Sequence, residues 1–301
     1  MRVAVRTGTY SIVARDPATG ELGVAVQSHW FSVGSLVSWA EPGVGAVATQ
    51  ANVDPAYGPR TLALIRVGVT APDALARLLE ADPEADVRQV AAIDASGRVA
   101  VHTGAGCIPY AGDASGDDFS CQANMMGSEA VWGAMADAFR RAEGPLTHRL
   151  LAALDAGEGA GGDVRGRQSA ALLVVGRTGE PWERTVELRI EDHADPLAEL
   201  RRLVRLSEAY AEAGEGDRLV GEGRHREAAA RYIRAAELVP DNHELMFWAG
   251  LGTALAGDVD GGAERVAAAI ALEPGWGELL PRLTPDTAPS AAAVLARLRD
   301  R

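Results

Sequence analysis

The chain has 301 residues, of which 47% are hydrophobic, so it is long enough to bury a substantial core and to form two domains. Its net charge of -13 argues against a nucleic-acid or anionic-membrane partner, because both require basic surface. We expect a cytoplasmic protein, since no apolar run is long enough to span a bilayer, the N-terminus lacks the apolar core of a secretory signal, and only Cys107 and Cys121 are present.

Up to about residue 195, the pattern predicts β-hairpins that alternate with pairs of helices. The predicted strands are Thr9–Ala14, Leu22–Ser28, Ser35–Trp39, Val44–Gln50, Val87–Ile93, Arg98–His102, Ser169–Val175 and Thr185–Ile190. The predicted helices are Gly58–Arg66, Ala71–Ala81, Ser128–Arg141 and Pro145–Ala156. Because strands and helices occur in runs rather than in strict alternation, the order favours an α+β fold in which two sheets lie between two layers of helices.

From about residue 196 the sequence is almost continuously helical, and it repeats itself. Residues 209–242 align with residues 243–276 at an offset of 34, and Pro240 then matches Pro274. This period is typical of tetratricopeptide-like helix–turn–helix units, and we expect the preceding helix, Pro196–Ala213, to cap them. The alternative is a plain helical bundle whose apparent repeat reflects its Ala-rich composition.

Thr9 is the strongest candidate for chemistry, because the Gly8–Thr9 bond stands directly ahead of the first predicted hairpin. A threonine that becomes the first residue carries both a nucleophilic hydroxyl and a free amine that titrates at about 8. The amine then serves as the base, and no separate histidine is needed. The other interpretation is that Thr9 is an ordinary strand residue behind a leader.

A glycine-rich polar segment, residues 161–169, leads into the predicted strand Ser169–Val175. Asp163 in this segment is suited to orient an amine or a hydroxyl. Arg165 or Arg167 is suited to hold a substrate carboxylate through two hydrogen bonds. A solvated loop with an internal ion pair explains the same residues equally well.

Three further residues are weaker candidates. His102 has the chemistry of a base, although a lone histidine at a strand end is more often a structural donor. Cys107 is more readily explained as a buried thiol than as a nucleophile. Asn124 precedes a predicted helix. It either caps this helix or donates a hydrogen bond to an oxyanion.

The sequence offers no clear metal site. His193 has no second histidine at ligand spacing, and we expect no metal and no cofactor.

Several motifs together give the chain a resemblance to a known family. They are Thr9–Asp16, Gly43–Gln50, Tyr57–Arg60, His102–Gly104, Gly162–Asp163, Gly166–Ala170 and Asp192–Pro196. From residue 9 to about residue 205, the chain resembles the bacterial family filed as domain of unknown function 1028. The resemblance implies the αββα sandwich of the N-terminal-nucleophile (Ntn) hydrolases, relatives of the proteasome β-subunit and of asparaginase-type amidases.

The resemblance also implies a role for Thr9, because family members commonly begin Met-Thr at this position. Residues 1–8 precede Thr9 in this chain, and three explanations are open. The start codon is assigned too early, the chain cleaves itself at Gly8–Thr9 as proteasome precursors do, or Thr9 stays blocked. By analogy of order with the proteasome, Asp163 stands where a carboxylate approaches the catalytic amine, whereas Ser35–Trp39 offers no counterpart of the proteasome lysine.

Two functions follow from these observations. The first is an amidohydrolase that acts on a small amide or peptide-like metabolite, with a set of candidate residues: Thr9 and Asp163 as catalytic groups, and Arg165, Arg167, His102 and Asn124 as substrate-binding groups. The second is a catalytically silent fold that serves as a binding or scaffold protein.

The predicted organisation is a leader (1–8), a sandwich domain (9–195) and a helical domain (196–301). We expect the helical domain to recruit a protein partner or to join copies of the chain in a homo-oligomer.

Overall fold

The computed structural model of this protein describes residues 6–300 and divides the chain into two compact units, Met1–Arg201 and Arg202–Arg301. Residues 1–5 of the predicted leader lie outside the described part of the chain. The division between the units falls within the long helix α6 (Pro196–Gly221), whose first residue is also the first of the predicted helical domain.

The first unit contains two antiparallel sheets. One comprises β1 (Arg6–Thr7), β4 (Ser38–Glu41), β5 (Gly45–Asn52), β6 (Arg88–Asp94) and β7 (Val99–Thr103). The other has the order β11 (Val186–Ile190), β10 (Ser169–Val175), β3 (Leu22–Ser28), β2 (Thr9–Arg15), β9 (Phe119–Asn124) and β8 (Gly112–Gly116). Strands β2 and β3 are buried along almost their whole length, because both faces of their sheet are covered.

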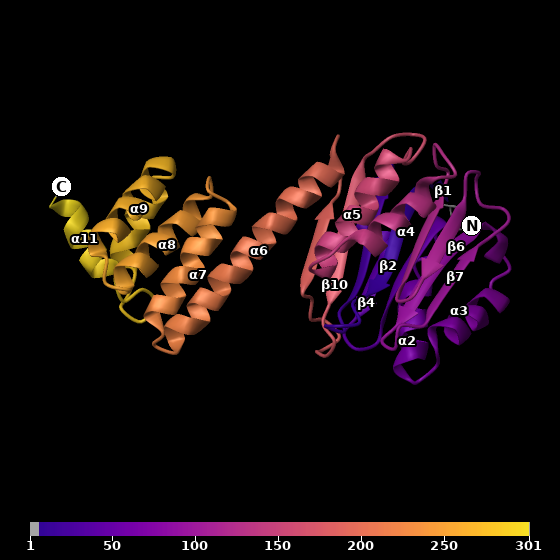
Figure 1. Cartoon of the computed structure of the whole chain (residues 1–301), viewed down its shortest axis with the longest axis horizontal. Coiled ribbons are helices and arrows are strands. Elements are labelled where there is room, and N and C mark those ends of the chain that lie inside the picture. The colour runs from indigo at the N-terminus through magenta and orange to yellow at the C-terminus, as the bar shows by residue number, and fades with distance from the viewer. Residues whose placement is uncertain (1–5, 301) are drawn as a thin grey trace. The chain divides into compact units, whose positions relative to one another are not determined.

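The two sheets face each other, and each carries helices on its outer face (Figure 1). The helices of this unit are α1 (Gly34–Val37), α2 (Tyr57–Arg66), α3 (Ala71–Glu80), α4 (Val131–Arg141) and α5 (Leu146–Gly159). Helices α2 and α3 pack on the β5–β6 sheet, whereas α4 and α5 pack on the β2–β3 sheet. Apolar side chains such as Val13, Val24 and Ile93 fill one half of the space between the sheets.

The structure differs from the sequence-based assignment in several elements. Strand β1 lies within the predicted leader, and the predicted capping helix Pro196–Ala213 is too short, because α6 continues to Gly221. The predicted strand Ser35–Trp39 is wrong in its first half, because Gly34–Val37 forms the helical turn α1 and the strand begins only at Ser38. Strands β8 and β9 were not predicted. The buried side chains of Gln122 and Asn124 make β9 look like a polar loop, yet both amides find hydrogen-bond partners between the sheets.

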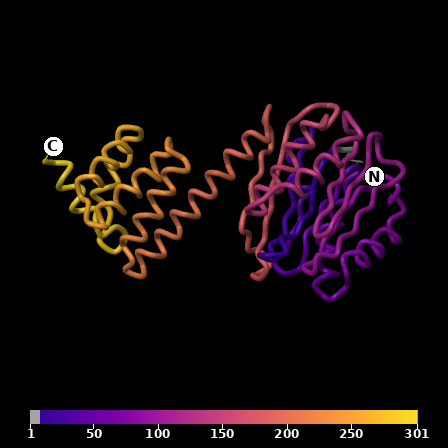
Figure 2. The backbone as a smooth tube through the Cα atoms, in the orientation of Figure 1, coloured from indigo at the N-terminus to yellow at the C-terminus, as the bar shows by residue number. Residues whose placement is uncertain are grey.

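The second unit is helical, and its backbone runs back and forth through successive helices (Figure 2). After α6 these are α7 (His225–Leu238), α8 (His243–Leu255), α9 (Val259–Leu272), α10 (Gly275–Leu279) and α11 (Ala291–Arg299). Helices α7 and α9 keep the offset of 34 residues seen in the sequence. Gly250 and Gly262 let α8 and α9 approach closely, since a Cβ on Gly250 would lie 2.8 Å from the oxygen of Gly262. Within residues 6–300, no helix combines the length and the apolar character that crossing a membrane requires.

Candidate active site around Thr9

Thr9 opens the central strand β2, and the chain reaches it from the other sheet. The preceding strand β1 pairs with the end of β5, so Gly8 is the residue at which the chain changes sheets. Thr9 pairs with Ser28 of β3 on one side and with Asn124 of β9 on the other. Its side chain is fully buried, so the hydroxyl is closed to a substrate in this chain, in which Gly8 is still attached.

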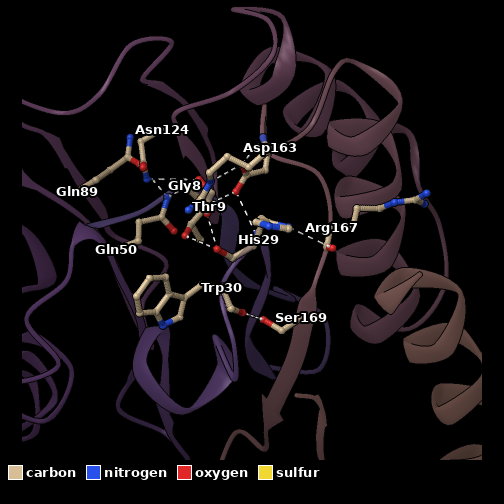
Figure 3. A network of polar contacts seen from close by, with 12 residues as sticks. Gly8, Thr9, His29, Trp30, Gln50, Gln89, Asn124, Asp163, Arg167 and Ser169 are labelled. Carbon is tan, nitrogen blue, oxygen red and sulfur yellow. Dashed lines mark hydrogen bonds and ion pairs between the residues drawn. The ribbon is translucent and has the colours of Figure 1, made fainter. Parts of the chain in front are cut away.

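The carbonyl oxygen of Gly8 accepts hydrogen bonds from two side chains. The hydroxyl of Ser28 donates to it, and Nη2 of Arg165 donates over 3.0 Å. The hydroxyl of Thr9 in turn donates to the hydroxyl oxygen of Ser28 over 3.2 Å. A continuous hydrogen-bonded path therefore connects the Thr9 hydroxyl with the carbonyl oxygen of the peptide bond that precedes it (Figure 3).

Asp163 and Arg165 form an ion pair beside Gly8. Nε and Nη2 of Arg165 donate to the two carboxylate oxygens of Asp163 at 3.0 and 2.7 Å, and the backbone N–H of His29 donates to Oδ2 at 3.1 Å. The carboxylate side chain has no exposed surface. Because a bidentate pair fixes the plane of the guanidinium group, Arg165 is held with Nη2 toward the Gly8 oxygen.

Buried amides hold the carbonyl of Thr9 from the opposite side. Nε2 of Gln50 donates to the Thr9 oxygen at 3.2 Å and to Oε1 of Gln89 at 2.8 Å. Nδ2 of Asn124 donates to the same two acceptors at 3.4 and 3.0 Å. Figure 3 shows these amides gathered on one side of Thr9, with Asp163 and His29 on the other. A buried network paired in this way specifies one arrangement of the Gly8–Thr9 junction.

A pocket of about 140 Å³ lies beside this junction. Its lining consists of Ala51, Asn52, Val87, Gly106, Cys107, Ile108, Asn124 and Met125. Ala51 and Met125 have φ angles of 67° and 60°, which are costly for residues other than glycine and are concentrated at ligand sites in proteins. Since none of the described lining residues is charged, the pocket suits an uncharged group.

Cys107, which lines this pocket, has the properties of a structural thiol. Burial raises the pKa of Cys107, and a backbone contact with Gly104 lowers it only in part. The thiol also donates to the carbonyl oxygen of Arg88 over 3.4 Å. It therefore stays protonated at neutral pH and is not an activated nucleophile.

Two of the predicted substrate-binding residues lie away from Thr9. His102 stands on β7 opposite Val90, whose side chain packs with those of α2 and α3, and its Nε2 lies 2.8 Å from the oxygen of Ala85. The side chain of Arg167 points away from Thr9 (Figure 3) and pairs with Glu158 at 3.5 Å and Asp195 at 3.3 Å. Neither residue belongs to the group around Thr9, because the pleat of β7 and these two ion pairs direct them elsewhere.

Asn124 and Arg165 reach the site in ways that the sequence did not indicate. Asn124 is not a helix cap, because it ends β9 and the next helix begins only at Val131. Arg165 contacts the Gly8 carbonyl oxygen and Asp163, so its guanidinium group is not free for a substrate carboxylate.

Sequence reasoning missed Ser28, His29, Gln50 and Gln89. A signal existed for Ser28, since the predicted hairpin with its short turn already sets this residue opposite Thr9. No local signal existed for Gln50 and Gln89, because both come from the other sheet.

The comparisons with known proteins agree on the family of the first unit. The model of a family described as "Family of unknown function (DUF1028)" matches residues 9–200. A solved DUF1028 structure, protein SPO2555 from Silicibacter pomeroyi, is 34% identical, with a TM-score of 0.60, covering 66% of this chain and 88% of that chain. Anbu (ancestral β-subunit) from Yersinia bercovieri is 13% identical over 64% of this chain and 91% of that chain, and its TM-score of 0.33 is too low to support any argument.

The same comparisons supply no activity, and no curated protein matches the chain. The resemblance read from the motifs is confirmed, because the family model covers most of the chain and begins at Thr9. This chain belongs to the DUF1028 family, a family of unknown function.

Proposed function

We propose that this chain is the precursor of an Ntn amidohydrolase, in which the Thr9 hydroxyl is the nucleophile and the Thr9 amine, freed by cleavage of the Gly8–Thr9 bond, is the base. The observation that carries the proposal is the path from the Thr9 hydroxyl through Ser28 to the Gly8 oxygen. The layers of the first unit, two facing sheets with helices outside, follow the αββα order of this class of hydrolases.

The first step of cleavage, transfer of the Gly8 acyl group from the Thr9 nitrogen to Thr9 Oγ, needs no group from outside the chain. Oγ of Thr9 adds to the carbonyl carbon of Gly8 as its proton passes to Ser28, which shares its own proton with the Gly8 oxygen until the leaving nitrogen takes it up. Ser28 and Arg165 stabilise the negative charge that develops on the Gly8 oxygen. Breaking the C–N bond leaves a Gly8 ester on Thr9 Oγ and an amine that takes up the proton. Water then hydrolyses the ester to a Gly8 carboxylate and restores the hydroxyl.

In the cut chain, the free amine removes the proton of the Thr9 hydroxyl during attack on a substrate amide. Asp163 supports this step, because its buried carboxylate lies beside the position of Gly8, where it can orient the ammonium group. We propose a small amide or a peptide-like metabolite as the substrate. Its carbonyl oxygen takes the place that the Gly8 oxygen occupies next to Ser28 and Arg165.

The intact mass and N-terminal sequence of the purified protein test this function. The expected chain begins at Thr9, and the Thr9→Ala variant keeps the leader because it lacks the nucleophile. Thr9→Ser retains a hydroxyl and is expected to be cut. Thr19→Ala changes an exposed threonine in the first hairpin turn and serves as the control. A wild-type protein that retains residues 1–8 would contradict the proposal.

A second candidate function is protein binding by the second unit, whose helices we propose to be tetratricopeptide-like. A concavity of about 600 Å³ on this unit combines aromatic with acidic side chains, among them Tyr210, Tyr232, Trp248, Asp217, Glu244 and Asp286. Such a surface suits a basic segment of a partner or of a second copy of the chain. Light scattering on the full chain tests self-association. An oligomer that Asp286→Lys dissociates supports it, and a monomeric wild-type protein contradicts it.

A further inference from the structure

The position of the leader residues before Thr9 indicates where the acyl side of a substrate lies in the proposed enzyme. Strand β1 pairs antiparallel with the end of β5, with Arg6 opposite Asn52 and Thr7 opposite Ala51. On its other edge, β5 pairs with β6. Strand β4 covers Gly45–Ala48 on the same edge as β1, so loss of the leader frees the end of this edge, at Ala51 and Asn52, for another extended chain. Sheet edges commonly bind extended peptides in this way.

The first bond that Thr9 cuts also defines the acyl group that the site accepts. Self-cleavage passes through an ester between the Gly8 acyl group and Thr9 Oγ. A substrate whose acyl residue is glycine, carried on an extended chain, forms an ester of the same kind. Hydrolysis of that ester by water, which releases the carboxylate and returns the proton to Thr9 Oγ, is the same step in both reactions.

The surroundings of Gly8 leave no room for a larger acyl residue. A Cβ on Gly8 would lie 2.8 Å from Nη2 of Arg165, 2.8 Å from Oδ2 of Asp163 and 3.0 Å from Sδ of Met125. The contacting atoms of Arg165 and Asp163 lie at the ends of flexible side chains. These two side chains are nevertheless held in place by their mutual hydrogen bonds and by the backbone N–H of His29. Their displacement would also remove a donor from the carbonyl oxygen under attack.

We propose that the mature enzyme hydrolyses amides of glycine-terminated acyl chains, which pair with the edge of β5 that β1 occupies in the precursor. This inference rests on the proposed function, because it requires Thr9 as the nucleophile. The acyl chain is peptide-like, its last residue is glycine, and the amine that leaves is not restricted by these contacts.

Four fluorogenic substrates test the proposal on protein whose N-terminus is shown to be Thr9. They are the aminomethylcoumarin amides of acetyl-Ala-Ala-Gly, acetyl-Ala-Ala-Ala, acetyl-Ala-Ala-Leu and unextended glycine. We expect kcat/KM for acetyl-Ala-Ala-Gly to exceed that for acetyl-Ala-Ala-Ala by at least about 50-fold, since one methyl group in a closely packed site has an effect of this order. Unextended glycine is expected to react at least about 10-fold more slowly than the extended glycine substrate, because it lacks the strand.

Two variants locate the selectivity in the structure. Met125→Ala is expected to raise the rate ratio of the alanine to the glycine substrate, because it removes the sulfur nearest to the added methyl group. Met246→Ala makes the same change in α8 of the second unit; it is the matched control and is expected to leave the ratio unchanged. In the full-length chain, Gly8→Ala is expected to slow self-cleavage at least about 10-fold, by the same close contacts.

The outcomes separate this inference from the function on which it rests. A wild-type chain that retains its leader overturns both. A chain that begins at Thr9 but hydrolyses the alanine or leucine substrate as fast as the glycine substrate, or none of the four, overturns the glycine proposal alone. Cleavage of the Gly8→Ala precursor at the wild-type rate also overturns the glycine proposal, and this test requires no substrate-turnover assay.

Discussion

At the scale of single residues, the site depends on short polar links whose order determines the chemistry. Ser28 accepts a hydrogen bond from Thr9 and donates one to Gly8, so in the proposed reaction it contacts both the attacking oxygen and the oxygen that becomes negative. Arg165 supplies the second donor to the Gly8 oxygen and is held in place by Asp163. In the proposed reaction, these groups are positioned before any bond breaks, and such preorganisation is the main source of electrostatic catalysis.

Ser28→Ala removes one donor to the Gly8 oxygen together with the route for the Thr9 proton. We expect self-cleavage to slow about 100-fold, the usual effect of deleting one such donor. The rate is measured by mass spectrometry of precursor made in a cell-free system. Ser120→Ala is the matched control, because Ser120 is buried in the same sheet without contacting Gly8. Equal cleavage rates for Ser28→Ala and wild type would show that Ser28 has no part in the reaction.

Asp163→Asn tests the carboxylate through the pH dependence of turnover. We propose that the neutral amine is the base in the chain that begins at Thr9, so kcat/KM is expected to rise as pH increases through the pKa of an α-amine, at about 8. A nearby carboxylate favours the ammonium form and keeps this pKa high. Its removal should move the rising limb of the profile to lower pH, as well as reducing the rate. An unshifted profile would mean that Asp163 does not act on the amine.

At the scale of elements, Asp94 connects a hairpin with a helix in the first unit. Its carboxylate accepts hydrogen bonds from Ser96 and Arg98 in the β6–β7 turn and from the backbone N–H of Ala71 at the start of α3. Burial raises the pKa of Asp94, but these hydrogen bonds outweigh burial and hold the pKa below its usual value. The charged form is therefore the one that stabilises the fold.

Asp94→Asn is expected to lower the free energy of unfolding at pH 7 by about 2 kcal/mol, since charge-assisted hydrogen bonds are lost. The native pKa lies below the unfolded value of about 3.9, so the stabilisation is complete above that pH and disappears as pH falls through the native pKa. The difference between variant and wild type should thus shrink in strong acid, as measured by urea unfolding at several pH values. The exposed Asp86→Asn is the control. A difference that is constant with pH would contradict this account.

At the scale of the whole molecule, the first unit supplies the hydrogen bonds to the Gly8–Thr9 junction that are seen among residues 6–300. Ser28, Gln50, Asn124, Asp163 and Arg165 come from strands and loops between β3 and β10. Because these hydrogen bonds are formed within the first unit, we propose a separate role for the second unit.

A chain that ends at Arg201 is therefore expected to lose its leader at the same bond as the full chain. Intact mass gives the result, and a cooperative thermal transition shows that the shortened chain folds. If the shortened chain folds but keeps residues 1–8, the second unit takes part in cleavage and the division of roles is wrong.

The sequence by itself determined the local elements and the family. The hairpin β2–β3, the helices α2 and α3 and the repeat of the second unit follow from patterns among near neighbours in the chain, and the motifs that begin at Thr9 indicated the family correctly. These features depend on short-range periodicity and turn chemistry, which a linear sequence displays directly.

Only the tertiary structure decided what surrounds Thr9. Gln50 and Gln89 look like ordinary polar strand residues in the sequence. When the two sheets stack face to face, Gln50 donates to the Thr9 carbonyl oxygen, and Gln89 accepts hydrogen bonds from Gln50 and Asn124. The pairing of β7 with β6 places His102 on the face of the sheet that carries the helices, and Arg167 pairs with Glu158 and Asp195. Candidates that look equivalent in the sequence are therefore separated in space. The physical reason is that buried polar groups must be satisfied by partners from distant strands, and those partners are set by packing and register rather than by any local pattern.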